Sequence, residues 1–140
     1  MKTLRLILGD QLNIKHSWFT KPEQNVVYCM FEMRQETDNV VHHIQKVVGF
    51  FVAMRQFAKD LDILGHKVMY LKITDSENKH NLNDNLKKII QENRIERLEY
   101  IYPDEYRLDK QLTNLHTEIN IEMEPYSAQH FYTSRTDLKE

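Results

Sequence analysis

The sequence predicts a doubly wound α/β fold, in which helices cover both faces of a mainly parallel five-stranded sheet. Short segments rich in β-branched and aromatic residues alternate with segments whose apolar residues recur every three or four positions. Strands that alternate with helices require right-handed crossovers, which give a parallel sheet. The 140 residues contain three glycines and three prolines, with no repeat and no linker-like run. We therefore expect a single domain over residues 1–140.

Five segments are predicted to form strands because they are short, apolar and rich in strand-forming residues. In chain order they are residues 3–8, 25–31, 67–73, 97–102 and 118–124. The first four are expected to be largely buried, as strands of a parallel sheet are. Between the first two strands, residues 13–24 are irregular, which fits a loop with or without a short helical turn.

A long helix is predicted between the second and third strands, and two further helices over residues 82–93 and 105–116. Residues 37–39 offer N-cap side chains before the long helix, and Gly65 supplies a left-handed stop after it. The resulting order of elements is typical of a Rossmann-like sheet. The apolar stripe of the long helix consists of Val40, Ile44, Val47, Phe51, Met54, Ala58 and Leu61.

Composition narrows the possible functions. The formal net charge of −2 comes with no sustained basic stripe, so we expect no direct DNA binding by this domain. Cys29 is the single cysteine and lies in an apolar strand, which is typical of a small buried hydrophobe in a reducing compartment. There is no leader-like segment after Met1 and no apolar run as long as a membrane span. We therefore expect a cytoplasmic protein without a membrane partner.

No catalytic motif is complete in this sequence. It contains neither a glycine-rich dinucleotide fingerprint nor a phosphate-binding P-loop, and no serine lies in a nucleophile elbow. Its seven histidines and one cysteine have no metal-ligand spacing. We therefore predict no catalytic residue and no metal ligand. An enzyme acting on a nucleotide is correspondingly disfavoured.

The most informative stretch is the end of the first predicted strand, where an apolar run stops at Gly9, Asp10 and Gln11. Ligands of open α/β sheets bind beyond the carboxyl ends of the strands, where a glycine lets the backbone approach and polar groups meet the ligand. The alternative is an ordinary turn with a solvated Asp10. This segment is the first half of a predicted binding site.

The second half follows the second strand, where Glu36, Asn39, His43 and Lys46 precede or open the long helix. Both segments leave their strands at the carboxyl end, so we expect their polar groups to share one rim of the sheet. The alternatives are helix-start electrostatics for Glu36, a half-buried histidine and a solvated lysine.

Together these residues resemble the N-terminal region of the deoxyribodipyrimidine photolyase-related proteins, which include iron–sulfur bacterial cryptochromes and (6-4) photolyases. The order and spacing of the matching motifs agree over essentially the whole chain. The motifs are Leu6-Ile-Leu-Gly-Asp-Gln-Leu12, Glu36 before His42-His43, Phe50-Phe-Val-Ala-Met-Arg-Gln-Phe-Ala58, Pro103-Asp-Glu-Tyr-Arg107 and Phe131-Tyr-Thr-Ser-Arg135.

The resemblance implies a light-harvesting antenna domain that binds 6,7-dimethyl-8-ribityllumazine. In the family, a following helical domain carries FAD, a [4Fe–4S] cluster and the DNA lesion pocket. The present chain ends before that domain, so the resemblance implies excitation transfer to a flavin held elsewhere, in cis or in trans. We expect no DNA photolyase (carbon–carbon lyase) activity from these residues alone.

Residue by residue, the resemblance places Gly9, Asp10, Glu36 and His43 at the lumazine, with Gln11 and Lys46 beside them. Phe50 and Phe51 would form an apolar wall for the ring. The sequence departs from the family at Asn39, where relatives have tyrosine. The alternative function is a structural module that kept the fold, lost the chromophore and docks on a helical partner.

Overall fold

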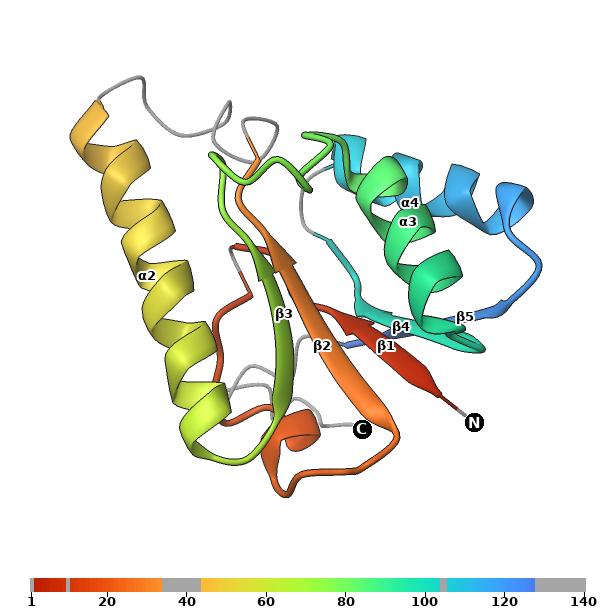
Figure 1. Cartoon of the computed structure of the whole chain (residues 1–140), viewed down its shortest axis with the longest axis horizontal. Coiled ribbons are helices and arrows are strands. Elements are labelled where there is room, and N and C mark those ends of the chain that lie inside the picture. The colour runs from red at the N-terminus through yellow and green to blue at the C-terminus, as the bar shows by residue number, and fades with distance from the viewer. Residues whose placement is uncertain (1, 10, 34–43, 104–105, 128–140) are drawn as a thin grey trace, which may run out of the picture.

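The computed structural model describes residues 2–9, 11–33, 44–103 and 106–127, without the side chains of residues 44–47. Within these ranges, five strands form one entirely parallel sheet in the order β3-β2-β1-β4-β5 (Figure 1). The doubly wound, Rossmann-like fold class is therefore confirmed. The strands are β1 (Thr3–Leu6), β2 (Val26–Phe31), β3 (Lys67–Leu71), β4 (Arg97–Ile101) and β5 (Glu122–Tyr126). The helices are η1 (Ser17–Phe19, a 3-10 turn), α2 (Ile44–Ile63), α3 (Leu82–Asn93) and α4 (Tyr106–Glu118).

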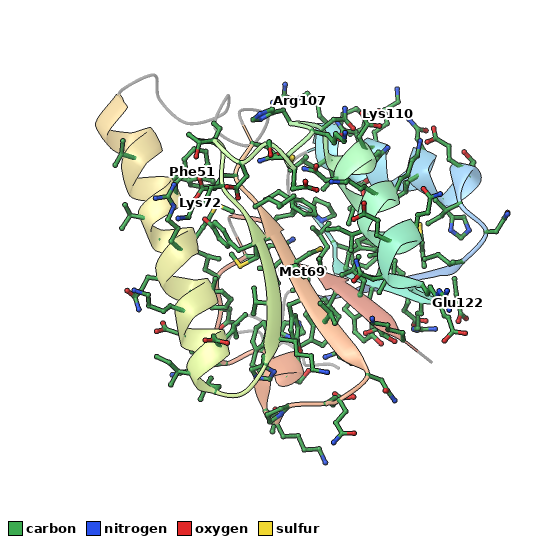
Figure 2. The ribbon with its side chains drawn as sticks, in the orientation of Figure 1. Phe51, Met69, Lys72, Arg107, Lys110 and Glu122 are labelled. Carbon is green, nitrogen blue, oxygen red and sulfur yellow. The ribbon has the colours of Figure 1, made fainter. Side chains whose placement is uncertain are left out.

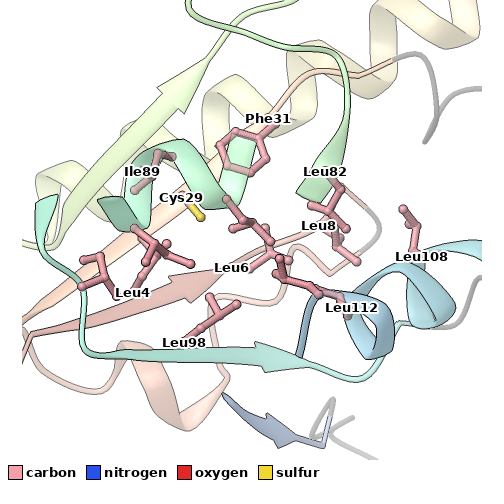
Figure 3. Packing of buried hydrophobic residues seen from close by; sticks show 14 of the residues in the cluster. Leu4, Leu6, Leu8, Cys29, Phe31, Leu82, Ile89, Leu98, Leu108 and Leu112 are labelled. Atoms are coloured by element: carbon pink, nitrogen blue, oxygen red, sulfur yellow. The ribbon is translucent and has the colours of Figure 1, made fainter. Parts of the chain in front are cut away.

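Alternating side chains divide β1 between the two faces of the sheet. Leu4 and Leu6 are buried against leucines and isoleucines of α3 and α4 (Figure 3), whereas Ile7, directly after β1, belongs to the cluster formed with η1 and α2. Helices thus cover both faces, as predicted. The polar side chain of Arg5 lies in the middle of β1 and is also buried.

The ends of the helices follow local signals in the sequence. Beyond the end of α2, Gly65 adopts a left-handed φ of +96°, as its position predicts. The Oδ1 of Asn81 accepts a hydrogen bond from the backbone N–H of Asp84 at 3.1 Å, which caps α3. The prediction for α3 is confirmed, and α4 begins one residue later and ends two residues later than predicted.

Two predictions about strands were wrong. The fifth strand is not at residues 118–124 but at Glu122–Tyr126, because the leucine stripe of α4 extends that helix to Glu118. Ile119 and Ile121 pack against the α3 and α4 side of the core instead of starting the strand. β3 is partly exposed rather than largely buried, because it is an edge strand with a neighbour on one side alone.

Among the described helices, none is both long and apolar enough to cross a membrane.

Candidate functional site

The strand order reverses between β1 and β4, and this reversal defines the candidate site. β2 and β3 lie on one side of β1, whereas β4 and β5 lie on the other. In open α/β sheets, ligands bind in the crevice beyond the carboxyl ends of the strands at such a switch point. Gly9 follows β1 at this position and is buried. The first half of the predicted site therefore lies at the switch point.

Gln11 bridges the two strands that flank the switch point. Its Oε1 accepts a hydrogen bond from the backbone N–H of Leu8 at 3.0 Å, and its Nε2 donates to the carbonyl oxygen of Ile101 at 3.1 Å. The amide thus satisfies backbone groups at the exits of β1 and β4. Gln11 is one of the predicted site residues, and sequence reasoning did not anticipate this joining role.

Most of the other predicted site residues lie outside the part of the chain that the structure describes. Asp10, Glu36, Asn39 and His43 lie outside the described residues, and of Lys46 only the backbone, in α2, is described. Figure 1 shows that α2 begins at the end of the sheet toward which β2 points. The first turns of α2 therefore lie at the same end of the sheet as the β1 exit.

Phe50 and Phe51 occupy different environments on α2. Phe51 is buried in the cluster with η1, whereas Phe50 is only partly buried against that cluster. Their ring centroids lie 6.1 Å apart. Of the two rings predicted to form an apolar wall, that of Phe51 is therefore part of the hydrophobic core, whereas Phe50 is partly exposed to solvent. A role in cofactor binding stays a prediction for both.

Glu32 is a polar residue that sequence reasoning missed. It directly follows β2 and is fully buried. Arg55 of α2 binds it through two hydrogen bonds, Nε to Oε2 at 2.5 Å and Nη2 to Oε1 at 2.9 Å. The hydroxyl of Tyr70 donates to Oε2 at 2.5 Å, and the backbone N–H of Ile73 donates to Oε1 at 2.9 Å.

These contacts determine the protonation state of the Glu32 side chain. Burial opposes ionisation and is the largest single influence, but the hydrogen bonds from Arg55, Tyr70 and Ile73 together outweigh it and lower the pKa of the carboxyl. Burial, with the carboxylate beside it, raises the pKa of Tyr70. Glu32 is therefore an ionised carboxylate that holds β2, β3 and α2 together. The signal in the sequence was an acid directly after an apolar strand.

A second buried ionic network crosses the sheet on the α2 side. Glu99 of β4 accepts hydrogen bonds at 2.7 Å from Nε of Arg5 and at 2.7 Å from Nε of Arg97. Nη1 of Arg5 also donates to the hydroxyl of Tyr28 at 2.9 Å, and its guanidinium lies 4.9 Å from the centre of the Trp18 ring. This network joins β1, β2 and β4 and has a structural role.

Among the residues that the structure describes, no group of three or more histidine, cysteine, aspartate or glutamate side chains is arranged so that it could hold a metal ion.

The fold and the switch point define an α/β domain of the kind that binds small ligands at the carboxyl edge of its sheet. The model of the family "Deoxyribodipyrimidine photo-lyase-related protein" matches residues 5–140. The chain therefore belongs to the photolyase-related family. It is 29% identical over 142 residues to a (6-4) photolyase of Agrobacterium fabrum (strain C58), covering 99% of this chain and 28% of that relative. The chain thus spans between a quarter and a third of the relative's length.

Proposed function

We propose that this chain is an antenna domain that binds 6,7-dimethyl-8-ribityllumazine and passes excitation to a flavin on a helical domain. The observation that carries the proposal is the family match over residues 5–140 on a sheet with a switch point between β1 and β4. The similarity to a (6-4) photolyase supports a link to light-driven DNA repair. The bound lumazine would supply absorption of light, whereas this chain would supply binding and orientation.

The chemistry of the ligand suits the residues at this edge. A lumazine ring has hydrogen-bonding groups along its pyrimidine edge, a chain of ribityl hydroxyls and a flat face. Gly9 carries no side chain to block a ring at the β1 exit, and the partly exposed ring of Phe50 offers an apolar contact. Asp10, Glu36 and His43 are proposed to bind the polar edge and hydroxyls. Asn39 and Lys46 are proposed to lie beside them.

Reconstitution tests this proposal directly. The purified chain is incubated with the lumazine and passed through a gel-filtration column, and the absorbance of ligand that elutes with the protein is measured. We expect about one lumazine per chain, and at least about tenfold weaker binding for Glu36→Gln or Asp10→Asn, because each removes a charged acceptor.

Glu92→Gln is the matched control, since Glu92 is exposed on α3, on the other face of the sheet. It should bind lumazine as the unaltered chain does. A chain that elutes colourless, or one whose binding is equally reduced by Glu92→Gln, would refute the antenna role.

One observation favours the alternative of a structural, partner-docking module. The Gln11 amide, which the prediction assigns to the ligand, is bound to the backbone of Leu8 and Ile101. Such a module would capture a helical flavoprotein without holding lumazine. A pull-down with a separately expressed helical FAD domain distinguishes the two functions, because the antenna role requires bound lumazine in the complex.

A further inference from the structure

A cavity of about 390 Å³ lies between α2 and the edge strand β3, away from the switch point between β1 and β4. It is open to solvent. Its volume is within the range of small-molecule sites. Among the predicted lumazine residues whose side chains the structure describes, Gln11 and Phe50 are not part of its wall.

The charged residues of the cavity are arranged along its length. Arg55, Lys59 and Asp62 share one face of α2, at spacings of four and three residues. Because α2 is the crossover between two parallel strands, it runs antiparallel to β3. Lys72, directly after β3, therefore lies at the Arg55 end, and Asp62 lies at the other. In Figure 2, Lys72 appears beside the N-terminal half of α2, near Phe51.

Two lysines give one end of the cavity its positive charge, because the third cation, Arg55, is paired with the buried carboxylate of Glu32. The side chain of Arg55 is 46% exposed and also forms part of the cavity wall. Glu32 thus balances the charge of Arg55. Lys59 on α2 and Lys72 after β3 are both exposed and add two positive charges to the lining of the cavity. One end of the cavity is cationic in a chain whose net charge is −2.

The inner surface of the cavity is mostly apolar. Ala58 of α2 and Val68 and Tyr70 of β3 contribute to it, and all three are partly buried. The hydroxyl of Tyr70 is held by Glu32, which fixes the position of its ring. A flat hydrophobic body can therefore lie against this surface while a charged group reaches the lysines.

We propose that this cavity binds a phosphate group carried on a flat aromatic body, as in a nucleoside monophosphate. The phosphate binds Lys59 and Lys72 beside Arg55, and the base packs against Tyr70 and Ala58. A donor on the base, such as the exocyclic amine of adenine, faces the carboxylate of Asp62. Because the lysines and Asp62 lie at different positions along the cavity, they determine which end of the ligand lies at which end of the cavity.

Binding is measured by titrating AMP, adenosine or inorganic phosphate into the isotope-labelled 140-residue chain and following its backbone amides by NMR. We expect AMP to bind more tightly than either adenosine or phosphate, with the largest shifts in α2 and β3. Because the contacts to phosphate are ionic and exposed, the affinity for AMP should fall as salt is raised.

Three variants locate the two ends of the ligand. Lys59→Gln and Lys72→Gln should each weaken AMP about fivefold, the effect of one exposed ion pair of good geometry. Ala58→Leu fills the apolar surface and should weaken AMP while leaving phosphate binding unchanged. Lys110→Gln is the matched control, because Lys110 is exposed on α4, on the opposite face of the sheet (Figure 2).

The proposal is overturned if millimolar AMP leaves α2 and β3 unshifted, or if adenosine binds as tightly as AMP. It is equally overturned if Lys110→Gln weakens AMP as much as Lys72→Gln does. Circular dichroism of each variant checks folding, and the two lysine variants report independently because they lie on different elements.

Discussion

The side-chain amide of Gln11 donates to the carbonyl oxygen of Ile101 at 3.1 Å, across the line where the strand order of the sheet reverses. Its own carbonyl oxygen accepts from the backbone N–H of Leu8 at 3.0 Å. One side chain thus joins the exits of β1 and β4, the two strands between which a ligand of this fold binds. Gln11 stabilises the edge of the sheet on which the candidate site is built.

Replacing this amide should cost stability. Gln11→Ala leaves the N–H of Leu8 and the carbonyl of Ile101 without these partners, and we expect the free energy of unfolding to fall by about 1–3 kcal/mol. Urea denaturation followed by circular dichroism measures the change. Gln91→Ala, on an exposed turn of α3, is the control and should change stability by less than about 0.5 kcal/mol. Equal effects of the two substitutions would contradict the joining role.

Glu32→Gln should destabilise the chain more strongly. The amide keeps the shape of the carboxylate, but its NH₂ group replaces an oxygen that accepts two hydrogen bonds, one from Arg55 and one from either Tyr70 or Ile73. We expect a loss of about 2–4 kcal/mol, somewhat below the cost of breaking a fully buried pair because Arg55 is half exposed. Gln56→Ala, at the next position of α2, is an exposed control. A Glu32→Gln variant with an unaltered urea midpoint would show that the ion pair contributes nothing.

Stability should decrease in acid. The pKa values of Glu32 and Glu99 are both lowered, because hydrogen bonds from arginines and other donors together outweigh burial, the largest single influence. A lowered folded-state pKa means that the unfolded chain binds protons more readily. The stabilisation is therefore complete above the ordinary glutamate pKa of about 4.3 and is lost as the pH falls through the lower folded value.

Urea midpoints measured between about pH 3 and pH 5 test this pH dependence. The midpoint should fall steadily as the pH falls, and Glu32→Gln should show a shallower fall because the carboxyl at position 32 no longer titrates. Burial lowers the pKa of His16, so this residue also reduces stability as the pH falls below its ordinary pKa of about 6.5. Its contribution is common to both chains and cancels when their pH profiles are compared. A pH profile as steep in Glu32→Gln as in the unaltered chain would exclude Glu32 as a source.

Cys29 should be unreactive in the folded protein. Its side chain is fully buried beside Leu4 and Leu6, and burial raises the pKa of the thiol, which suppresses the reactive thiolate. We expect a thiol reagent to label the native chain at least about a thousandfold more slowly than the chain in urea. Cys29→Ala provides the unlabelled baseline. Rapid labelling without urea would show that this side of the core opens readily.

The elements that the sequence predicted well are those with strong local signals. The spacing of Leu82, Leu86 and Ile89 predicted α3 with the bounds that the structure shows, and Gly65 was correctly predicted as the stop after α2. The fifth strand was misplaced because Ile119 and Ile121 continue an apolar pattern that fits a helix end or a strand start equally well. Local spacing carries no information on which of these packs against the core.

The sequence alone was sufficient to predict that Gly9 follows the first strand, that Cys29 is buried and that the chain belongs to the photolyase-related family. All three predictions depend on local pattern and motif spacing. Folding in three dimensions was needed to pair Glu32 with Arg55 and Glu99 with Arg5, to join Gln11 to Ile101 and to form the cavity beside β3. These partners are separated by 23, 94 and 90 residues along the chain. The sequence around a charged or amide side chain does not indicate which distant residue it will pair with. Only the packing of helices and strands brings these partners together.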